Sequence, residues 1–168
     1  MSAFDNANDT LAMIQTMYDK DFAPYFKENH DLYKRMQSEL RPITDEELSR
    51  VLIALPLSLF EVGAVISDLR TKVEIAKLRI KETEFAIMQE SDAKTVTAKK
   101  DEAMMHTMDD HVLLCAYLGL IDRVEAEMSF SRELIMGAKK IWDSRRRTED
   151  SNPVAPIDIP EYDGGLVQ

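Results

Sequence analysis

Glycine is scarce in this chain, with five residues in 168, and two of these, Gly164 and Gly165, lie among the last five positions. Sheets built from strands and tight turns need more turn-forming residues than this. The ten methionines and the abundant Glu, Lys, Leu and Ala instead favour helix, because their side chains lose little rotamer freedom there. The composition therefore predicts an all-α fold.

Cysteine is limited to Cys115, which excludes an internal disulfide and a zinc site built on several cysteines. Its neighbours Leu114 and Ala116 are apolar, so we predict that Cys115 is a small buried side chain. The chain also lacks an uninterrupted apolar run of about 18 residues and a basic-then-apolar N-terminus. We therefore predict a cytoplasmic protein without a membrane partner.

Catalytic motifs are absent as well. The sequence has no HExxH pattern, Gly-rich phosphate loop, GxSxG or Cys/His nucleophile pair. One cluster resembles a set of metal ligands: His106, Asp109, Asp110 and His111. On a helix, however, His111 lies well round from His106, and no fourth ligand stands at a familiar spacing. We predict a solvated polar turn there, no metal, no cofactor and no enzymatic activity.

Acidic residues outnumber basic ones by ten, but they are unevenly spread. Residues 1–56 carry 10 acids and 6 bases, residues 57–148 carry 16 and 15, and residues 149–168 carry 5 and none. The nearly neutral middle segment thus holds most of the bases. An acidic chain of this kind can still bind a polyanion through residues 57–148.

The pattern of apolar residues divides the chain into three parts. In residues 1–56, helical spacing predicts two short helices that stop near Pro24 and Pro42. Thr44 followed by Glu47 forms a capping box that opens a further helix, which Pro56 interrupts or ends. Residues 149–168 contain three prolines, two glycines and no base, which predicts a disordered acidic tail.

Residues 57–148 predict a long antiparallel helical hairpin. Apolar positions alternate at steps of three and four over four heptads, a spacing typical of a helix that lies along another helix. These positions are Leu59, Val62, Ile66, Leu69, Val73, Ala76, Ile80, Thr83 and Ile87. The periodicity breaks at residues 91–96, and Thr97 is expected to start the next helix.

The second half of the hairpin carries two neighbouring apolar stripes, which together are wider than one helix can cover. The first comprises Leu113, Tyr117, Leu120, Val124, Leu134, Ala138 and Ile141. The second comprises Leu114, Leu118, Ile121, Met128, Ile135 and Trp142. The second stripe needs either the N-terminal helices or another copy of the chain, so we expect a homo-oligomer held by Leu118, Ile121 and Met128.

Basic side chains form two groups within the hairpin: Arg70, Lys72, Lys77, Arg79 and Lys81 in its first helix, and Lys139, Lys140, Arg145, Arg146 and Arg147 at the end of its second. They are either solvated flanks paired with nearby glutamates or a stripe that binds nucleic-acid phosphates. Arg145, Arg146 and Arg147 also suit a helix C-terminus, where cations oppose the macrodipole. Ile157, Ile159 and Tyr162 in the acidic tail resemble the partner-binding tails of single-stranded-DNA-binding proteins, although an inert solubilising tail has the same composition.

Two segments carry a resemblance to a known family. VEIAKLRIKETEF places Lys77, Arg79 and Ile80 as a Lys-x-Arg element followed by an apolar residue, and the run from Leu113 to Arg147 has a matching helical layout. In these features residues 57–148 resemble the UvsY-type recombination mediators of tailed phages. Such proteins are small and helical, bind single-stranded DNA and load a recombinase.

The resemblance implies a phage-encoded, homo-oligomeric accessory protein that binds single-stranded DNA and a phage recombinase or single-strand-binding protein. It departs from that family in lacking an aromatic pair after Lys-x-Arg, where Phe85 is the aromatic nearby, and in its residues 1–56 and tail. These departures suit small single-stranded-DNA-binding cofactors that recruit a phage RNA polymerase to promoters. A different alternative is a structural coiled-coil protein of a virion or scaffold, which binds no nucleic acid.

Overall fold

The computed structural model describes residues 3–38 and 42–150. Its fold is all-α, as predicted, with no strand in those two ranges. The helices are α1 (Ala3–Asp21), α2 (Ala23–Phe26), α3 (Asn29–Met36), α4 (Asp45–Glu90), α5 (Val96–His106) and α6 (Met108–Asp150). The predicted acidic tail lies outside the described residues except for Glu149 and Asp150, which end α6.

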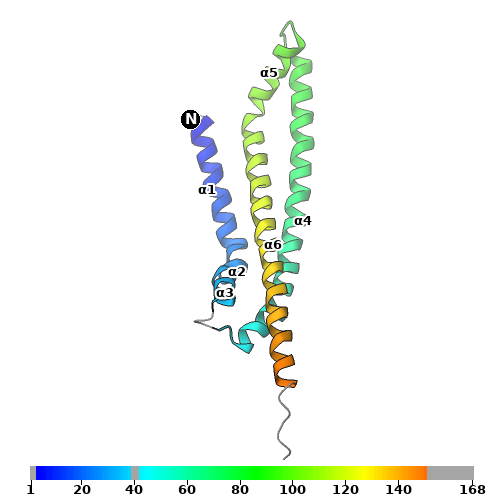
Figure 1. Cartoon of the computed structure of the whole chain (residues 1–168). Helices are drawn as coiled ribbons and strands as arrows, with labels where there is room; N and C mark the ends of the chain where they lie inside the picture. The colour runs from blue at the N-terminus through cyan, green and yellow to red at the C-terminus, as the bar shows by residue number, and fades with distance from the viewer. Residues whose placement is uncertain (1–2, 39–41, 151–168) are drawn as a thin grey trace, which may run out of the picture.

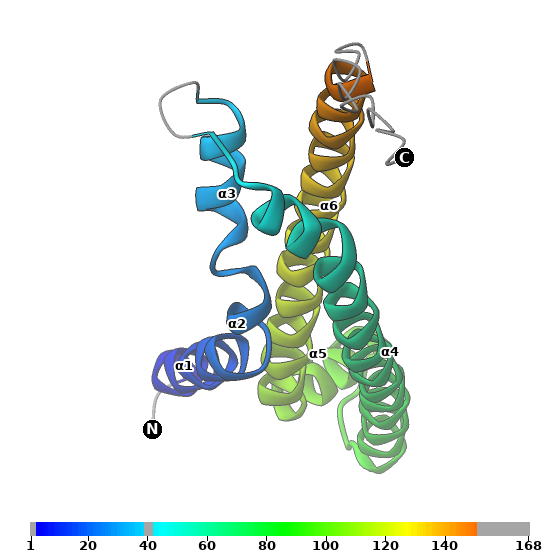
Figure 2. The same ribbon diagram turned by 90° about the horizontal axis from the view of Figure 1, so that it is seen from below.

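The hairpin consists of α4 and α6, which run antiparallel side by side (Figure 1). The short α5 lies at the tip and packs mainly on α4. Helices α1 and α3 pack on α6 from the other side, so that α6 lies between the N-terminal helices and α4 (Figure 2). The long hairpin predicted from the sequence is therefore confirmed, and α6 is its central helix.

Helix α4 starts at the predicted capping box. The Thr44 hydroxyl accepts a hydrogen bond from the Glu47 backbone N–H at 3.2 Å, and the Thr44 N–H donates to the Glu47 carboxylate at 2.9 Å. Both groups would otherwise lack partners at a helix start. Asp45, Glu46 and Glu47 also place negative charge at the positive end of the helix dipole.

Pro56 does not end this helix, which corrects the sequence prediction. It lies inside α4, which runs unbroken from Asp45 to Glu90. An internal proline removes one helical hydrogen bond and costs about 3 kcal/mol. Val51, Leu55 and Leu59 are buried on both sides of it, and packing of such a face supplies most of a helix's stability in a protein. The predicted boundary at residue 56 therefore falls within a continuous helix.

The predicted heptad positions of α4 form the contact with α6 along most of its length. Buried positions are Leu59, Val62, Ile66, Leu69, Val73 and Ile80. All except Ile80 belong to one core with the α6 residues Leu120, Val124, Leu134 and Ala138, the last three of which have no exposed surface. Thr83 is exposed and Ile87 is half-buried, so the seam loosens toward the tip.

The second stripe of α6 is covered within the chain. Tyr18, Phe22 and Phe26 are buried against the core, as are Ile121 and Met128 from that stripe. Met128 contacts α4 at Gly63, where an added Cβ would lie 3.9 Å from the end of the Met128 side chain, so α4 covers the second stripe at this position. The expected homo-oligomer therefore loses the surface on which it was predicted, and Ile121 and Met128 do not offer one.

Polar contacts fix the N-terminal helices on α6. The Asn29 side-chain amide donates to the Ser131 hydroxyl at 2.8 Å, and both residues are buried. The Arg123 guanidinium lies 3.5 Å from the centre of the Tyr18 ring, a cation–π contact. At Gly137, an added Cβ would lie 2.9 Å from the end of the flexible Met36 side chain, which would have to shift to make room.

The hairpin tip holds a polar cluster between the helices. Thr95, two residues before the predicted Thr97, caps α5 by accepting from the Ala98 N–H at 3.1 Å. Thr107, fully buried between α5 and α6, donates to the Glu84 carboxylate at 3.1 Å. The His111 ring nitrogen lies 2.9 Å from the same carboxylate, and this hydrogen bond lowers the pKa of Glu84.

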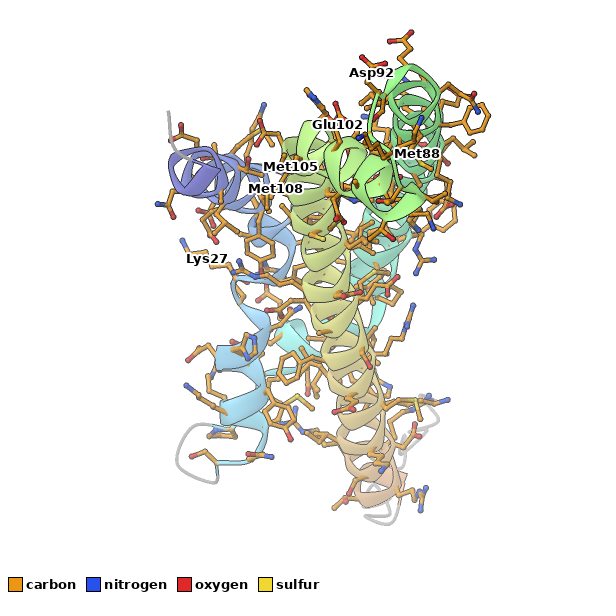
Figure 3. All side chains as sticks on the ribbon, turned by 90° about the horizontal axis from the view of Figure 1, so that it is seen from above. Lys27, Met88, Asp92, Glu102, Met105 and Met108 are labelled. Atoms are coloured by element: carbon orange, nitrogen blue, oxygen red, sulfur yellow. The ribbon has the colours of Figure 1, made fainter. Side chains whose placement is uncertain are left out.

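Figure 3 looks onto this tip and shows Met88, Asp92 and Glu102 gathered around the loop between α4 and α5. Met105 and Met108 lie on the side toward α1 and remain exposed.

One further contact joins α3 to the start of α4. Both guanidinium nitrogens of Arg35 donate to the Glu47 carboxylate, one of them at 2.7 Å. These bonds, together with the Thr44 N–H, lower the pKa of Glu47 to about 2. Glu47 therefore caps α4 and ties it to α3 as a carboxylate.

Glu47→Gln should lower the unfolding temperature at pH 7, because the neutral amide can still accept from the Thr44 N–H but loses the charge-assisted pair with Arg35. The contribution of a carboxyl with a lowered pKa is present above its ordinary value of about 4.3 and is lost as the pH falls toward about 2. The difference in unfolding temperature between wild type and Glu47→Gln should therefore disappear over that pH range, as followed by circular dichroism. Glu46→Gln removes a charge from the same turn without touching Arg35, and an equal gap in that control would contradict the assignment.

Candidate nucleic-acid interface

The basic residues of α4 do not form one stripe. At 3.6 residues per turn, Arg70, Lys77 and Lys81 project within about 40° of one another. Lys72 and Arg79 project together on a face roughly 140–180° away. The five candidates are therefore divided between two sides of the helix, and a single strand of nucleic acid lying on one side meets two or three of them.

Carboxylates neutralise part of the first set. Arg70 forms an ion pair with Glu125, which joins α4 to α6. Lys77 lies 2.7 Å from Glu74, one turn earlier on its own helix. The Lys77 pair is largely exposed, and such pairs contribute little and exchange readily. Lys72, Arg79 and Lys81 are exposed and take part in no ion pair within the described ranges.

At the end of α6, Arg145 has a structural role. Its guanidinium donates to the Ile43 carbonyl oxygen at 2.5 Å and also pairs with Asp45 at the start of α4. It thereby closes the open end of the hairpin. Its neighbours Arg146 and Arg147 are exposed.

The end of α6 is the most concentrated basic segment of the described chain. Residues 139–147 contain five bases, Lys139, Lys140, Arg145, Arg146 and Arg147, and one acid, Asp143. Lys140 and Arg147 line a shallow hollow together with Asp143, Ser144 and Thr148. Two of the bases, Lys139 and Lys140, were noted in the sequence but not placed among the predicted DNA ligands. The sequence places Lys139 and Lys140 within eight residues of Arg145, Arg146 and Arg147, and this spacing could have indicated that all five bases share one helix end.

The remaining predicted groups are distributed as follows. Ile157, Ile159 and Tyr162 lie outside the described residues. In the ranges 3–38 and 42–150, no three His, Cys, Asp or Glu side chains are placed to hold a metal ion. His106 is exposed, whereas His111 contacts Glu84. Cys115 is exposed, which contradicts its predicted burial, because it projects from α6 between the surfaces covered by α1 and α4.

Helix α4 also bears on the membrane prediction. By length and composition it is apolar enough to cross a membrane, and it is the one such helix in the described ranges. Glu61 interrupts the apolar run, so the sequence contains no uninterrupted apolar segment of about 18 residues in this helix. Only 28% of the apolar window is buried, so many of its apolar side chains are exposed. Core helices of globular proteins pass the same length and composition test, and α4 packs along α6.

Comparison with known proteins finds no matching family model, curated protein or solved structure. The resemblance to UvsY-type mediators therefore stays a prediction.

Arg145→Ala should lower the stability of the hairpin, because the variant leaves the Ile43 carbonyl and Asp45 without their shared partner. Loss of a hydrogen bond to a charged group costs about 1.5–3 kcal/mol when its partner is partly buried, and less with solvent exposure. Arg146→Ala removes the same charge from the next, exposed position and should leave stability within about 0.5 kcal/mol of wild type. Urea unfolding measures both, and equal losses would refute the distinction between the two arginines.

Proposed function

We propose that this protein is a phage-type accessory protein that binds single-stranded DNA through the basic end of α6. The observation that carries the proposal is the charge of residues 139–147, five bases with one acid, in a chain whose net charge is −10. A local cationic segment of this kind attracts phosphates even when the whole chain is acidic. The partial negative charge of the helix C-terminus also allows these bases to gather without strong mutual repulsion.

Phosphate binding here would release counterions, so that affinity falls steeply with salt. Lys139, Lys140, Arg146 and Arg147 are exposed and supply the cations. Trp142 lies in the same segment and is half-buried, which leaves part of its ring for base stacking. On α4, the proposed contribution is reduced to Lys81 and the exchangeable Lys77.

The role in the cell follows the resemblance. We propose a recombination-mediator-like protein acting in the host cytoplasm with a phage recombinase or single-strand-binding protein. The acidic segment 149–168, with Ile157, Ile159 and Tyr162, is the proposed partner contact. Recruitment of a phage RNA polymerase is the alternative role for the same DNA-binding chain, and a pull-down with residues 149–168 as bait separates the two.

A second candidate function is a structural coiled-coil protein that binds no nucleic acid. It is favoured by the pairing of Arg70, Lys77 and Arg145 with carboxylates and by the exposed apolar side chains of α4. This candidate predicts no DNA complex at any salt concentration. The following experiment decides between the two.

Arg146→Ala/Arg147→Ala should weaken binding of a labelled single-stranded oligonucleotide in a gel-shift or anisotropy titration. If both side chains contact phosphates, the slope of log K against log salt should decrease by about 1.4, at roughly 0.7 per phosphate for single strands. The matched control is Lys94→Ala/Lys100→Ala, which removes two exposed charges at the opposite end of the hairpin. Equal weakening in both variants, or no binding by wild type at low salt, would exclude the proposed interface.

Deletion of residues 149–168 should tighten DNA binding if the five acids of this segment compete with phosphates for the adjacent bases. The expected increase is largest at low salt, where charge competition is least screened. The same titration measures it, and the control is a full-length chain in which Asp158, Glu161 and Asp163 are changed to the corresponding amides. Weaker binding after deletion would show that the tail assists the DNA contact.

A further inference from the structure

Helix α4 has a second apolar stripe on the side opposite the hairpin core. The exposed members recur at helical spacing and project within about 80° of one another at 3.6 residues per turn. They are Ile53, Leu57, Phe60, Ala64, Ile75, Leu78 and Phe85. Phe60 is 80% exposed and Leu78 is 60% exposed. The sequence also contains this second stripe as a spacing of seven, at Leu57, Ala64, Thr71, Leu78 and Phe85. The heptad pattern was assigned to the buried stripe alone, so the exposed stripe was not predicted.

None of the described helices covers this stripe. Helices α1 and α3 lie beyond α6, and α5 lies at the tip (Figure 1). The six large side chains together expose on the order of 800 Å², the area that each partner buries in a standard protein interface. Exposed apolar patches above a few hundred Å² mark interaction surfaces.

The charges on one flank of the stripe are arranged symmetrically about position 70. One flank carries Glu61 and Asp68 in its first half and Lys72 and Arg79 in its second half. All four are exposed, and none forms an ion pair within the described ranges. Glu61 and Arg79 lie nine residues before and after position 70, and Asp68 and Lys72 lie two residues before and after it. The flank is therefore complementary to itself when reversed about that position.

We propose that this face of α4 binds the same face of a second copy of the chain, with the two helices antiparallel and centred near residue 70. In an antiparallel pair, like flanks face each other, so each Glu61 meets Arg79 of the other copy and each Asp68 meets its Lys72. Four ion pairs thereby form on one edge of the interface.

The apolar side chains match in the same register. Phe60 lies opposite Leu78 of the other copy, and Ala64 lies opposite its Ile75. Leu57 lies opposite Phe85. Thr71 and its neighbours form a polar centre. The interface is thus isologous, as in most closed homodimers. It replaces the α6 surface on which an oligomer was predicted, and it assigns Lys72 and Arg79 to self-association.

Sedimentation equilibrium of the full chain without DNA tests the proposal. Wild type should have twice the monomer mass of 19.2 kDa. Glu61→Lys and Arg79→Glu should each raise the dimer dissociation constant about tenfold at low salt, because each change sets two pairs of like charges against each other. The combined variant Glu61→Lys/Arg79→Glu restores all pairs and should return within about threefold of wild type. Restoration is specific to this register, because reversal of both charges in another register would not rebuild the pairs.

Leu78→Asp should yield a monomer with unchanged helical circular dichroism, whereas Met136→Asp is the matched control on α6, 59% exposed and outside the stripe. A monomeric wild type, a dimer that survives Leu78→Asp, or a failure of the combined variant to restore association would each overturn the proposal. A monomer that floats with neutral phosphatidylcholine vesicles would overturn it in favour of a lipid contact. The measurement is independent of DNA, so a dimer that binds no oligonucleotide would contradict the proposed function alone.

Discussion

The width of the apolar surface on α6 is the constraint on which the rest of the fold depends. One helix cannot cover two adjacent apolar stripes, so α6 must lie between two partners. Helix α4 buries one stripe through Val62, Ile66 and Leu69, and the N-terminal helices bury the other through Tyr18 and Phe22. The order of the chain follows from this: α6 is central, and α4 becomes an outer helix with one free side.

This arrangement also decides which charges remain available. Ion pairs fasten the outer helices where they meet α6, as Arg70 does with Glu125, or where they close the hairpin, as Arg145 does with Asp45. Bases used in this way are structural. Other exposed bases lie in two regions, the end of α6 and the outer flank of α4, which suits one region for a polyanion and the other for a chain of matching charge.

Much of the fold could be predicted from local signals. The heptads of α4 and the Thr44–Glu47 capping box each depend on residues within a few turns, and the structure contains both. Pro56 misled because its local cost is outweighed by packing on both sides of it. The side that each base faces, and the exposure of Cys115, depend on how α6 is turned between its neighbours. The rotation of α6 about its own axis is set by tertiary contacts such as that of Asn29 with Ser131, which are 102 residues apart. Periodicity alone does not reveal it.

The covering of α6 on both sides is best tested by amide hydrogen exchange of Phe22→Ala against wild type, read by peptide. Phe22 has no exposed surface, and its loss should loosen the contact between the N-terminal helices and α6. The account predicts faster exchange in α1 and in the facing part of α6, residues 117–131, with the tip, residues 84–107, unchanged. Faster exchange confined to α1, with α6 unaffected, would show that α6 does not depend on the N-terminal helices and would contradict the account.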